Sequence, residues 1–448
     1  MARSKSTQRG PLPSIQVTPS DAHLTRFAGL VPLLTFFQTL GLTQRFAEVV
    51  RSTSRRIHPV HKVLQAFMVC QLAGLHRLRH IEEAHDDAIL LKMCRLEYWP
   101  CRKVFSNALQ HLDDTGLHQL QDLIAEVGLM AQPKMTAAII DCDSTSLVCF
   151  GTQEGAQFGY CGKLGRNRRR HHPLVSSIAA SRAVISATYR DGSGVDSEET
   201  IAFLQDSFTR VKHHSPDVTV MTRLDSGFYS KAVCAWLLEQ GIDFAMALPL
   251  QAHLKDKLAA ASFTTLDEDI DTAVLAGTQL NLDERLRGVV IRRRVHDDTA
   301  PPPGKKIKGH PRYRYQAVIS SLSWSAPDLW RFYNDRGDCE RVFKVGRQSL
   351  GLGGLVGQSF RANTTAFLLR MLAFNLDRLF AVKTAEAAQA LGTGQSNLRE
   401  GLSSRQRRFY RSLGRLVQTG HRMILKVSTS RWCRQRWQRY GPDVLLQT

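Results

Sequence analysis

The segment MTAAIIDCDSTSLVCF, Met135 to Phe150, marks a change in the character of the chain. It follows Pro133 and is rich in β-branched residues, which predicts a β-strand. Asp141 and Asp143 lie two residues apart within it. Because side chains alternate between the two faces of a strand, both carboxylates are expected on the same face. The segment therefore combines the start of a predicted sheet with the first candidate functional residues.

The order of elements after this strand indicates an α/β fold. Two more strands are expected, at 173–181 and 183–192, and helices then alternate with strands. The helices are expected at 197–214 and 230–240, and the strands at 217–225 and 243–250. Three strands followed by such alternation predict a mixed sheet flanked by helices, a core of the ribonuclease-H kind.

Six regions are expected along the chain: a disordered basic arm at 1–20, a helical DNA-binding domain at 21–133, the first part of the core at 134–250, a β-strand-rich insertion at 251–325, the completion of the core at 326–380 and a basic helical region at 381–448. Apolar residues at three- and four-residue spacing predict the N-terminal helices. Structural helices with solvated basic faces are an equal alternative to DNA binding there.

The C-terminal region is strongly basic. From Arg399 to Tyr440 it holds twelve Arg or Lys residues, opposed only by Glu400, with Trp432 and Trp437 among them. Basic residues interleaved with aromatic ones favour contact with a phosphate backbone. A solvated helical face is the alternative.

Composition narrows the class of protein. With 448 residues, 43 % of them apolar, the chain can bury a sizeable core, which excludes a disordered protein. Sixty Lys and Arg against 40 Asp and Glu give a net charge of +20, and proteins this basic generally bind a polyanion, most often nucleic acid. Solubility alone is the other explanation for the charge. Nine cysteines without a CxxC pair indicate reduced, mostly buried thiols in a cytosolic protein.

The most apolar stretch, 27–50, is interrupted by Pro32, Gln38 and Arg45. It predicts a pair of core helices and not a membrane span.

A second polar motif is YNDRGDCERVFKVGR, Tyr333 to Arg347. Tyr333, Arg336, Glu340 and Arg347 stand at offsets of zero, three, seven and fourteen. At about 100° per residue, a single α-helix would place all four on one narrow face. The simple alternative is a surface ion pair between Glu340 and Arg336, worth about 0.2–0.5 kcal/mol.

Asp225 adds a carboxylate where the strand at 217–225 ends, and functional groups collect at such ends in α/β sheets. It could instead cap the next helix, although Ser230 is better placed to do so. Asp143 could cap a turn. Glu199 is a rival carboxylate, but with Asp196 it forms a capping box.

Carboxylates brought together raise one another's pKa unless a cation lies among them. Hard oxygen ligands suit Mg²⁺ or Mn²⁺. Two such ions about 4 Å apart can activate a water or 3′-OH and stabilise the leaving oxygen in phosphoryl transfer. On a basic protein, these acids predict chemistry on a nucleic-acid phosphodiester.

The triad Asp143, Asp225 and Glu340 resembles that of DDE insertion-sequence transposases with a ribonuclease-H-like core. DSTS at 143–146 resembles the first Asp motif of that family, and DSGF at 225–228 resembles the second. The run SFRANTTAFLLRMLAFNL that follows is also typical. The resemblance covers residues 135 to 380 approximately.

One group of these transposases carries a Y-(2)-R-(3)-E-(6)-K signature and a β-rich insertion before its Glu. Tyr333, Arg336 and Glu340 match the signature in type and spacing, and Arg347 stands where it has Lys. Arg also binds phosphate, with a different geometry.

The resemblance implies that Asp143, Asp225 and Glu340 hold Mg²⁺ or Mn²⁺, as two ions, with Asp141 as a supporting group or an alternative first ligand. DNA contacts would come from Tyr333, Arg336, Lys344 and Arg347. The implied activity is cut-and-paste transposition: binding of the terminal inverted repeats, strand cleavage, and transfer of the 3′-OH to target DNA. A homodimer on double-stranded DNA in the bacterial cytosol, with no membrane, is expected.

Two alternatives compete with this interpretation: a ribonuclease-H-like nuclease or resolvase without strand transfer, and a non-catalytic DNA-binding descendant.

Within the favoured interpretation, the DST motif favours Asp143 over Asp141. Asp143→Asn is then expected to abolish cleavage. Asp141→Asn is expected to leave slow, metal-dependent activity, and both variants are expected to fold.

Overall fold

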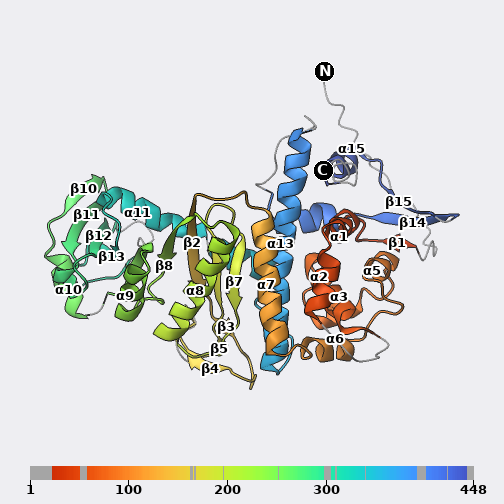
Figure 1. Cartoon of the computed structure of the whole chain (residues 1–448), viewed down its shortest axis with the longest axis horizontal. Helices are drawn as coiled ribbons and strands as arrows, with labels where there is room; N and C mark the ends of the chain where they lie inside the picture. The colour runs from red at the N-terminus through yellow and green to blue at the C-terminus, as the bar shows by residue number, and fades with distance from the viewer. Residues whose placement is uncertain are drawn as a thin grey trace, which may run out of the picture.

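The structure, a computed structural model, describes residues 23–50, 58–161, 165, 168–194, 196–250, 252–296, 304–307, 310–338, 340–390, 400–420 and 422–440. A mixed sheet of nine strands forms one half of it (Figure 1), in the order β10-β11-β12-β13-β9-β8-β2-β6-β7. In chain order the strands are β2 (Ala137–Ser144), β6 (Leu174–Ile178), β7 (Val184–Thr188), β8 (Thr219–Leu224), β9 (Asp243–Leu248), β10 (Thr264–Asp267), β11 (Ile270–Ala276), β12 (Arg287–Arg294) and β13 (Tyr313–Ser320).

The centre of this sheet mixes antiparallel and parallel pairs. β2 pairs antiparallel with β6, and β6 with β7. On its other side β2 pairs parallel with β8, and β8 with β9. The parallel neighbours need crossovers, which the helices α8 (Ser197–His214) and α9 (Lys231–Glu239) provide. This topology is compatible with the predicted ribonuclease-H-like core.

Residues 251–325, expected to be strand-rich, extend the same sheet. β13 pairs antiparallel with β9, and β12, β11 and β10 follow outward. The segment also holds the helix α10 (Ala252–Ala259) and the 3₁₀ turn η2 (Thr278–Leu280), which periodicity had not indicated. The insertion is therefore continuous with the core sheet.

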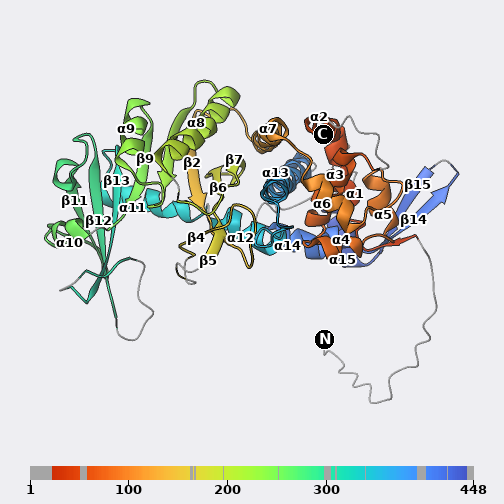
Figure 2. The ribbon, with the colours of Figure 1, turned by 90° about the horizontal axis from the view of Figure 1, so that it is seen from below.

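Each face of the sheet carries its own apolar core. Ala138, Ile140 and Cys142 of β2 join the cluster under α8 and α9. The opposite face packs on α11 (Ala326–Asn334), through Leu329 and Phe332. Figure 2 shows α8 and α9 on one side of the sheet, with α11 and α12 (Glu340–Ser349) on the other.

Helices make up the other half of the molecule. They are α1 (Leu30–Thr39), α2 (Leu42–Val49), α3 (Val60–Leu72), α4 (Leu78–Glu82), α5 (Ala88–Met93), α6 (Arg102–Leu109) and α7 (Asp114–Met130). The predicted helix pair at 27–50 is α1 and α2, with Pro32 in the first turn of α1, where it costs no hydrogen bond.

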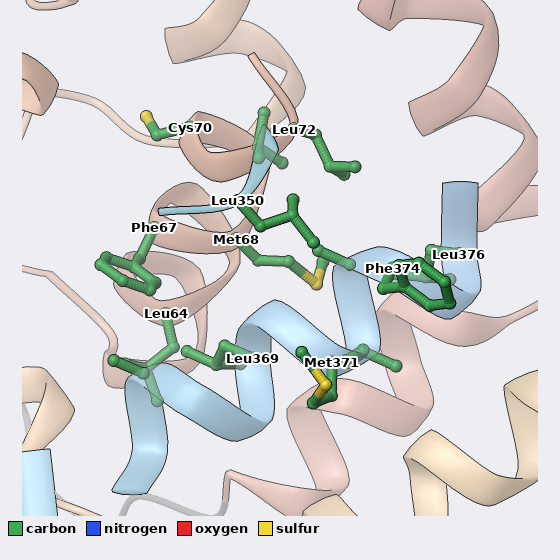
Figure 3. Packing of buried hydrophobic residues seen from close by; sticks show 14 of the residues in the cluster. Leu64, Phe67, Met68, Cys70, Leu72, Leu350, Leu369, Met371, Phe374 and Leu376 are labelled. Atoms are coloured by element: carbon green, nitrogen blue, oxygen red, sulfur yellow. The ribbon is translucent and has the colours of Figure 1, made fainter. Parts of the chain in front are cut away.

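One long helix, α13 (Phe360–Ala390), runs between the two halves (Figure 1). Figure 3 shows Leu369 of α13 beside Leu64 of α3. The helix is buried on nearly every side, as expected of a helix at the centre of a protein. It continues past residue 380, where a boundary between the core and the C-terminal region was expected, so one helix belongs to both expected regions.

Asn375 of α13 joins three elements through its side-chain amide. Nδ2 donates to the carbonyls of Ile124 on α7 and Val184 on β7, at 2.7 and 2.8 Å, and Oδ1 accepts from the Val184 N–H at 2.9 Å. β7 is the last strand of the sheet, so these backbone groups have no neighbouring strand. Gly128 of α7 permits the close approach, since a Cβ there would lie 2.6 Å from the Val184 carbonyl oxygen.

The C-terminal region differs from its predicted helical form. It contains α14 (Leu402–Arg405), the π-helical turn η4 (Gln406–Tyr410), a hairpin of β14 (Gly414–Thr419) and β15 (Arg422–Val427), and α15 (Arg431–Tyr440). β14 also pairs with β1 (Leu24–Thr25) near the start of the described chain. The apolar and β-branched residues Leu416, Val417, Ile424 and Leu425 suit a hairpin, and the helical prediction had followed charge instead.

The helix expected to hold Tyr333 through Arg347 is also divided. α11 ends at Asn334, the 3₁₀ segment η3 (Asp335–Asp338) follows, and α12 begins at Glu340. Gly337 in η3 disfavours a regular helix by about 1 kcal/mol relative to Ala. The argument from one continuous helical face is therefore wrong, although the side chains still converge, as described below.

Other expectations concern cysteines, membranes and the N-terminal arm. Of the eight cysteines within the described ranges, none forms a disulfide and six are buried. The described part of the chain has no helix with the length and hydropathy needed to cross a bilayer. The basic arm at 1–20 lies outside the described residues.

Asn375 provides a test of how the two halves are joined. Asn375→Leu should lower the free energy of unfolding by about 2–5 kcal/mol, because it leaves the buried N–H and C=O of Val184 without partners, at about 1–3 kcal/mol each. Urea denaturation followed by circular dichroism measures the change. The matched control, Asn107→Leu on the exposed face of α6, should stay within about 0.5 kcal/mol of wild type. Equal stability of the two variants would contradict the role of Asn375.

Candidate active site

Asp141 and Arg223 form a buried ion pair across the two central parallel strands. Their register places Asp141 of β2 directly opposite Arg223 of β8. Arg223 Nε and Nη2 donate to the two Asp141 carboxylate oxygens at 2.6 and 2.7 Å, and both residues are buried. Arg223 Nη1 donates to the carbonyl of Phe332 on α11 at 2.7 Å. Both Asp141 oxygens are thus committed to Arg223, which argues against the predicted metal-binding role for Asp141.

The same register brings Asp143 and Asp225 together. Each lies two residues beyond a member of the Asp141–Arg223 pair, so both emerge at the carboxyl ends of β2 and β8. Parallel neighbours end at the same edge of a sheet, which is the usual place for functional groups. The acid at this edge is therefore Asp143, as the motif match had favoured.

The Asp143 carboxyl group is buried, and its titration reflects its neighbours. Burial, together with the like charges of Asp225 and Glu340, raises its pKa to about 7, against the opposing effect of the Arg336 guanidinium and of a hydrogen bond from the Ser144 N–H. Carboxylates and a cation are thus near enough to interact at this edge.

Asp225 lies in the turn after β8. Its Oδ1 accepts a hydrogen bond from the Gly227 N–H at 2.7 Å, and a Cβ at Gly227 would lie 2.9 Å from that oxygen. Glycine at this position of the DSGF motif therefore makes room for the carboxylate. Ser230 caps α9 by accepting from the Val233 N–H at 3.0 Å, so Asp225 is not used as the helix cap.

Glu199 has a structural role, as expected. The Asp196 carboxylate caps α8 through the Glu199 N–H at 2.8 Å. The Glu199 carboxylate, however, pairs with Arg190. It does not reach back to complete the predicted capping box.

Arg336 lies among the acids. Its Nη1 is 3.6 Å from Asp143 Oδ1 and 3.3 Å from the Cys142 carbonyl oxygen, which accepts its hydrogen bond, and its Nη2 is 3.6 Å from Glu340 Oε1. Arg336 is buried, whereas the Glu340 side chain is largely exposed. The Glu340–Arg336 ion pair, which the sequence suggested could be a simple surface pair, is thus part of a half-buried group of charges.

Tyr333 is also buried, and burial raises the pKa of its hydroxyl against the opposing effect of Arg336. Burial of Tyr333 and Arg336 does not favour the direct phosphate contacts predicted for them. In the structure they lie behind the carboxylates, where they contact protein groups.

An open groove of about 1000 Å³ lies beside the acids. It is lined by Asp143, Thr145 and Gly337, and by six residues of α12: Glu340, Arg341, Phe343, Lys344, Arg347 and Gln348. Lys344 and Arg347 are exposed. Arg347 Nη2 donates to the Thr145 hydroxyl and, at 3.3 Å, to the Ser146 carbonyl. The predicted contact residues Lys344 and Arg347 therefore line a basic wall of the groove.

The fit to a divalent cation rests on the chemistry of the donors. The charges of Asp225 and Glu340 act on Asp143, which is buried with a raised pKa, and carboxylates that interact in this way favour a hard cation. Within the ranges that the structure describes, no three His, Cys, Asp or Glu side chains are arranged closely enough to hold a metal ion. Asp143 and Glu340 pair with Arg336 instead. The carboxylate oxygens are donors of the type that fits Mg²⁺ or Mn²⁺. In this structure the Asp143 and Glu340 carboxylates are positioned by their ion pairs with Arg336.

Arg223 is the residue that sequence reasoning missed. It precedes Asp225 by two positions, as Asp141 precedes Asp143. This equal spacing on two neighbouring strands could have suggested that Asp141 and Arg223 form a cross-strand ion pair. Thr145 and Ser146 accept hydrogen bonds from Arg347. Only their position next to Asp143 in the sequence could have suggested a place in the site.

Comparison with known proteins gives one family. The family described as transposase DDE domain group 1 matches this chain over residues 9–431. No curated protein sequence matches the chain.

The ion pair changes what is expected of Asp141. Asp141→Asn should lower the free energy of unfolding by about 3–5 kcal/mol, because it leaves Arg223 buried without a counter-charge. This replaces the expectation that the variant folds normally. Chemical denaturation measures the effect, and the double variant Asp141→Leu/Arg223→Met should recover most of the stability. Asp143→Asn is the matched control and should not lower the stability, because burial already disfavours the charged form of Asp143 and raises its pKa to about 7. A stable Asp141→Asn single variant would contradict the assignment.

Proposed function

The chain belongs to the family transposase DDE domain group 1, and on that premise we propose that it binds the ends of an insertion sequence and catalyses metal-dependent DNA cleavage and strand transfer. The proposed route is cut-and-paste, on a core of the ribonuclease-H kind. Asp143, Asp225 and Glu340 are proposed as its acidic triad.

One observation carries the assignment of residues. The parallel pairing of β2 with β8 places Asp143 and Asp225 at one edge of the sheet, where their charges interact. Glu340 lies across Arg336 from Asp143, on the first turn of α12. Two of these acids, Asp143 and Glu340, therefore pair with one arginine beside an open basic groove, and the charge of Asp225 reaches Asp143.

The proposed division of labour follows from burial. Lys344 and Arg347 on the exposed face of α12 would hold the phosphates of a DNA strand in the groove, since cations there face a polyanion. Arg336 would act as a positioning residue whose guanidinium holds Asp143 and Glu340 on either side of it and offsets their repulsion until they take up their ligand. Tyr333 would support Arg336 from the buried side.

The proposed metal would be held by Asp143, Asp225 and Glu340. When bound, a divalent cation would supply activation of a water or 3′-OH and stabilisation of the leaving oxygen. The bound charge would then offset the burial and, to a smaller extent, the mutual repulsion of the carboxylates that raise the pKa of Asp143. The same proposal includes two bound ions and a homodimer of the protein on double-stranded DNA.

Substitution of the acids tests the triad. Asp143→Asn, Asp225→Ala and Glu340→Ala should each reduce Mg²⁺- or Mn²⁺-dependent cleavage of DNA carrying the inverted repeats beside the gene by more than the 10- to 100-fold typical of a supporting residue. Binding of the same DNA in EDTA should persist. Glu239→Ala, which removes an exposed carboxylate of α9, is the control and should cleave normally. Full cleavage by any triad variant would remove that residue from the site.

The basic C-terminal region is also proposed to contact DNA. Deleting residues 399–448 is not a clean test, because Arg405 and Tyr410 both bind the buried Asp377 carboxylate of α13. Arg431 and Arg434, which are exposed on α15, can be replaced without disturbing those bonds.

Arg431→Gln/Arg434→Gln should weaken duplex binding and reduce the slope of log affinity against log salt by about 0.9 for each phosphate that the variant no longer neutralises. Fluorescence anisotropy across a salt series gives the slope. Arg285→Gln, a single exposed cation paired with Asp283, is the control and should leave the slope unchanged. An unchanged slope in the double variant would mean that α15 is a solvated face.

A further inference from the structure

A small three-stranded sheet lies beside the groove. Its order is β3-β5-β4, with β3 (Leu147–Val148), β4 (Gln157–Gly159) and β5 (Arg168–His171), and all of it lies between β2 and β6 in the sequence. Figure 2 shows β4 and β5 beside α12.

Three aromatic rings of this small sheet and its connections face solvent. Phe150 is 87 % exposed, Phe158 is 67 % exposed and Tyr160 is 62 % exposed. Rings in and around strands ordinarily pack against a neighbour, and a group of exposed ones marks an interaction surface. Packing within the small sheet does not explain why all three rings are exposed.

Cations accompany these rings. Arg169 lies opposite Phe158 in the β4–β5 register, and its guanidinium carbon is 5.4 Å from the ring centroid. Arg168 is exposed at the next position. Between 147 and 171 the sequence has one acidic residue, Glu154, and the Glu154 carboxylate accepts a hydrogen bond from the Phe360 N–H at 2.9 Å. The charge of the surface therefore suits an anionic partner.

Hydrogen bonds connect this surface to the groove. The Ser146 hydroxyl donates to the Tyr160 carbonyl at 2.9 Å, and Arg347 of α12 donates to the Ser146 carbonyl at 3.3 Å. Arg170, which is buried, donates to both Ser146 Oγ and the Tyr160 carbonyl, at 2.7 and 2.6 Å. The backbone that carries Tyr160 is thus held in place relative to the wall of the groove.

We propose that the sheet β3-β5-β4 binds unpaired DNA adjoining the groove, with Phe158, Tyr160 and Phe150 stacking on bases and Arg168 and Arg169 contacting phosphates. Exposed rings with interleaved cations are the arrangement that binds single strands, because every base offers a face for stacking. Bases in an intact duplex have their faces covered by their neighbours, so the surface selects unpaired nucleotides. This inference rests on the proposed function and extends it to a second binding surface.

A binding experiment without catalysis tests the surface. The full chain is titrated with a fluorescent oligothymidylate in EDTA. Phe158→Ala and Tyr160→Ala should each weaken binding by between about 5-fold and 150-fold, the range expected when one base–aromatic stack is removed. Phe158→Trp should keep the wild-type affinity, and Arg169→Gln should reduce the salt slope by about 0.7. Tyr98→Ala, which removes an equally exposed ring (62 %) in the helical half, is the matched control and should bind normally.

Duplex cleavage measured in parallel separates the two proposals. If wild type cleaves duplex ends and the alanine variants bind oligothymidylate as tightly as wild type, the surface is wrong and the proposed function stands. If no duplex is cleaved with either metal but Phe158→Ala still weakens strand binding, the surface stands and the proposed function fails. Sedimentation that shows altered self-association of Phe158→Ala, with unchanged strand affinity, would overturn the surface and make it an interface between copies of the chain.

Discussion

The buried pair of Asp141 and Arg223 is the interaction on which the arrangement of the site depends. It crosses between the two central parallel strands, and the third donor of Arg223 holds the end of α11 through the Phe332 carbonyl. A one-residue slip of β8 against β2 would leave two charges buried without partners, at a cost of several kcal/mol per ion. The pair therefore stabilises one register strongly. That register is also the one that puts Asp143 next to Asp225, while the anchored α11 leads the chain into Arg336 and Glu340.

A second group of buried polar interactions joins the helical half to the sheet. Asn375 satisfies the free edge of β7, where the sheet would otherwise end in unpaired backbone groups. Asp377, two residues further along α13, accepts from Arg405 and from the Tyr410 hydroxyl. The basic C-terminal region is thereby attached to the same central helix that packs on α3 and α7. Any DNA held by α15 would be held by a part of the molecule with a defined position relative to the groove.

The charges at the sheet edge are arranged by sign and by depth. Asp143 and Glu340 line the groove with the cations of α12, and Arg336 is buried behind these two acids, paired with both. Beyond them, the small sheet β3-β5-β4 adds aromatic rings and further arginines. This order suits a nucleic-acid strand, whose phosphates require cations along their length and whose reacting phosphate requires the acids. Burial of Arg336 favours a role in placing the acids over one in direct contact with DNA.

Much of this could be read from the sequence, because strands and helices with a clear apolar period form where that period predicts. The helix at 197–214 and the acids Asp143 and Asp225 at strand ends are examples. The break at Gly337 between α11 and α12 and the hairpin of β14 and β15 are local features that the emphasis on charge obscured. The partner of Asp141 could not be read from local pattern, because Arg223 lies 82 residues away in the chain. Sequence alone determined which acids and cations the chain carries and on which elements. Tertiary structure decided that Asp141 is neutralised by Arg223 while Asp143 is not, because only the pairing of β2 with β8 brings one carboxylate to a buried arginine and the next to the open edge.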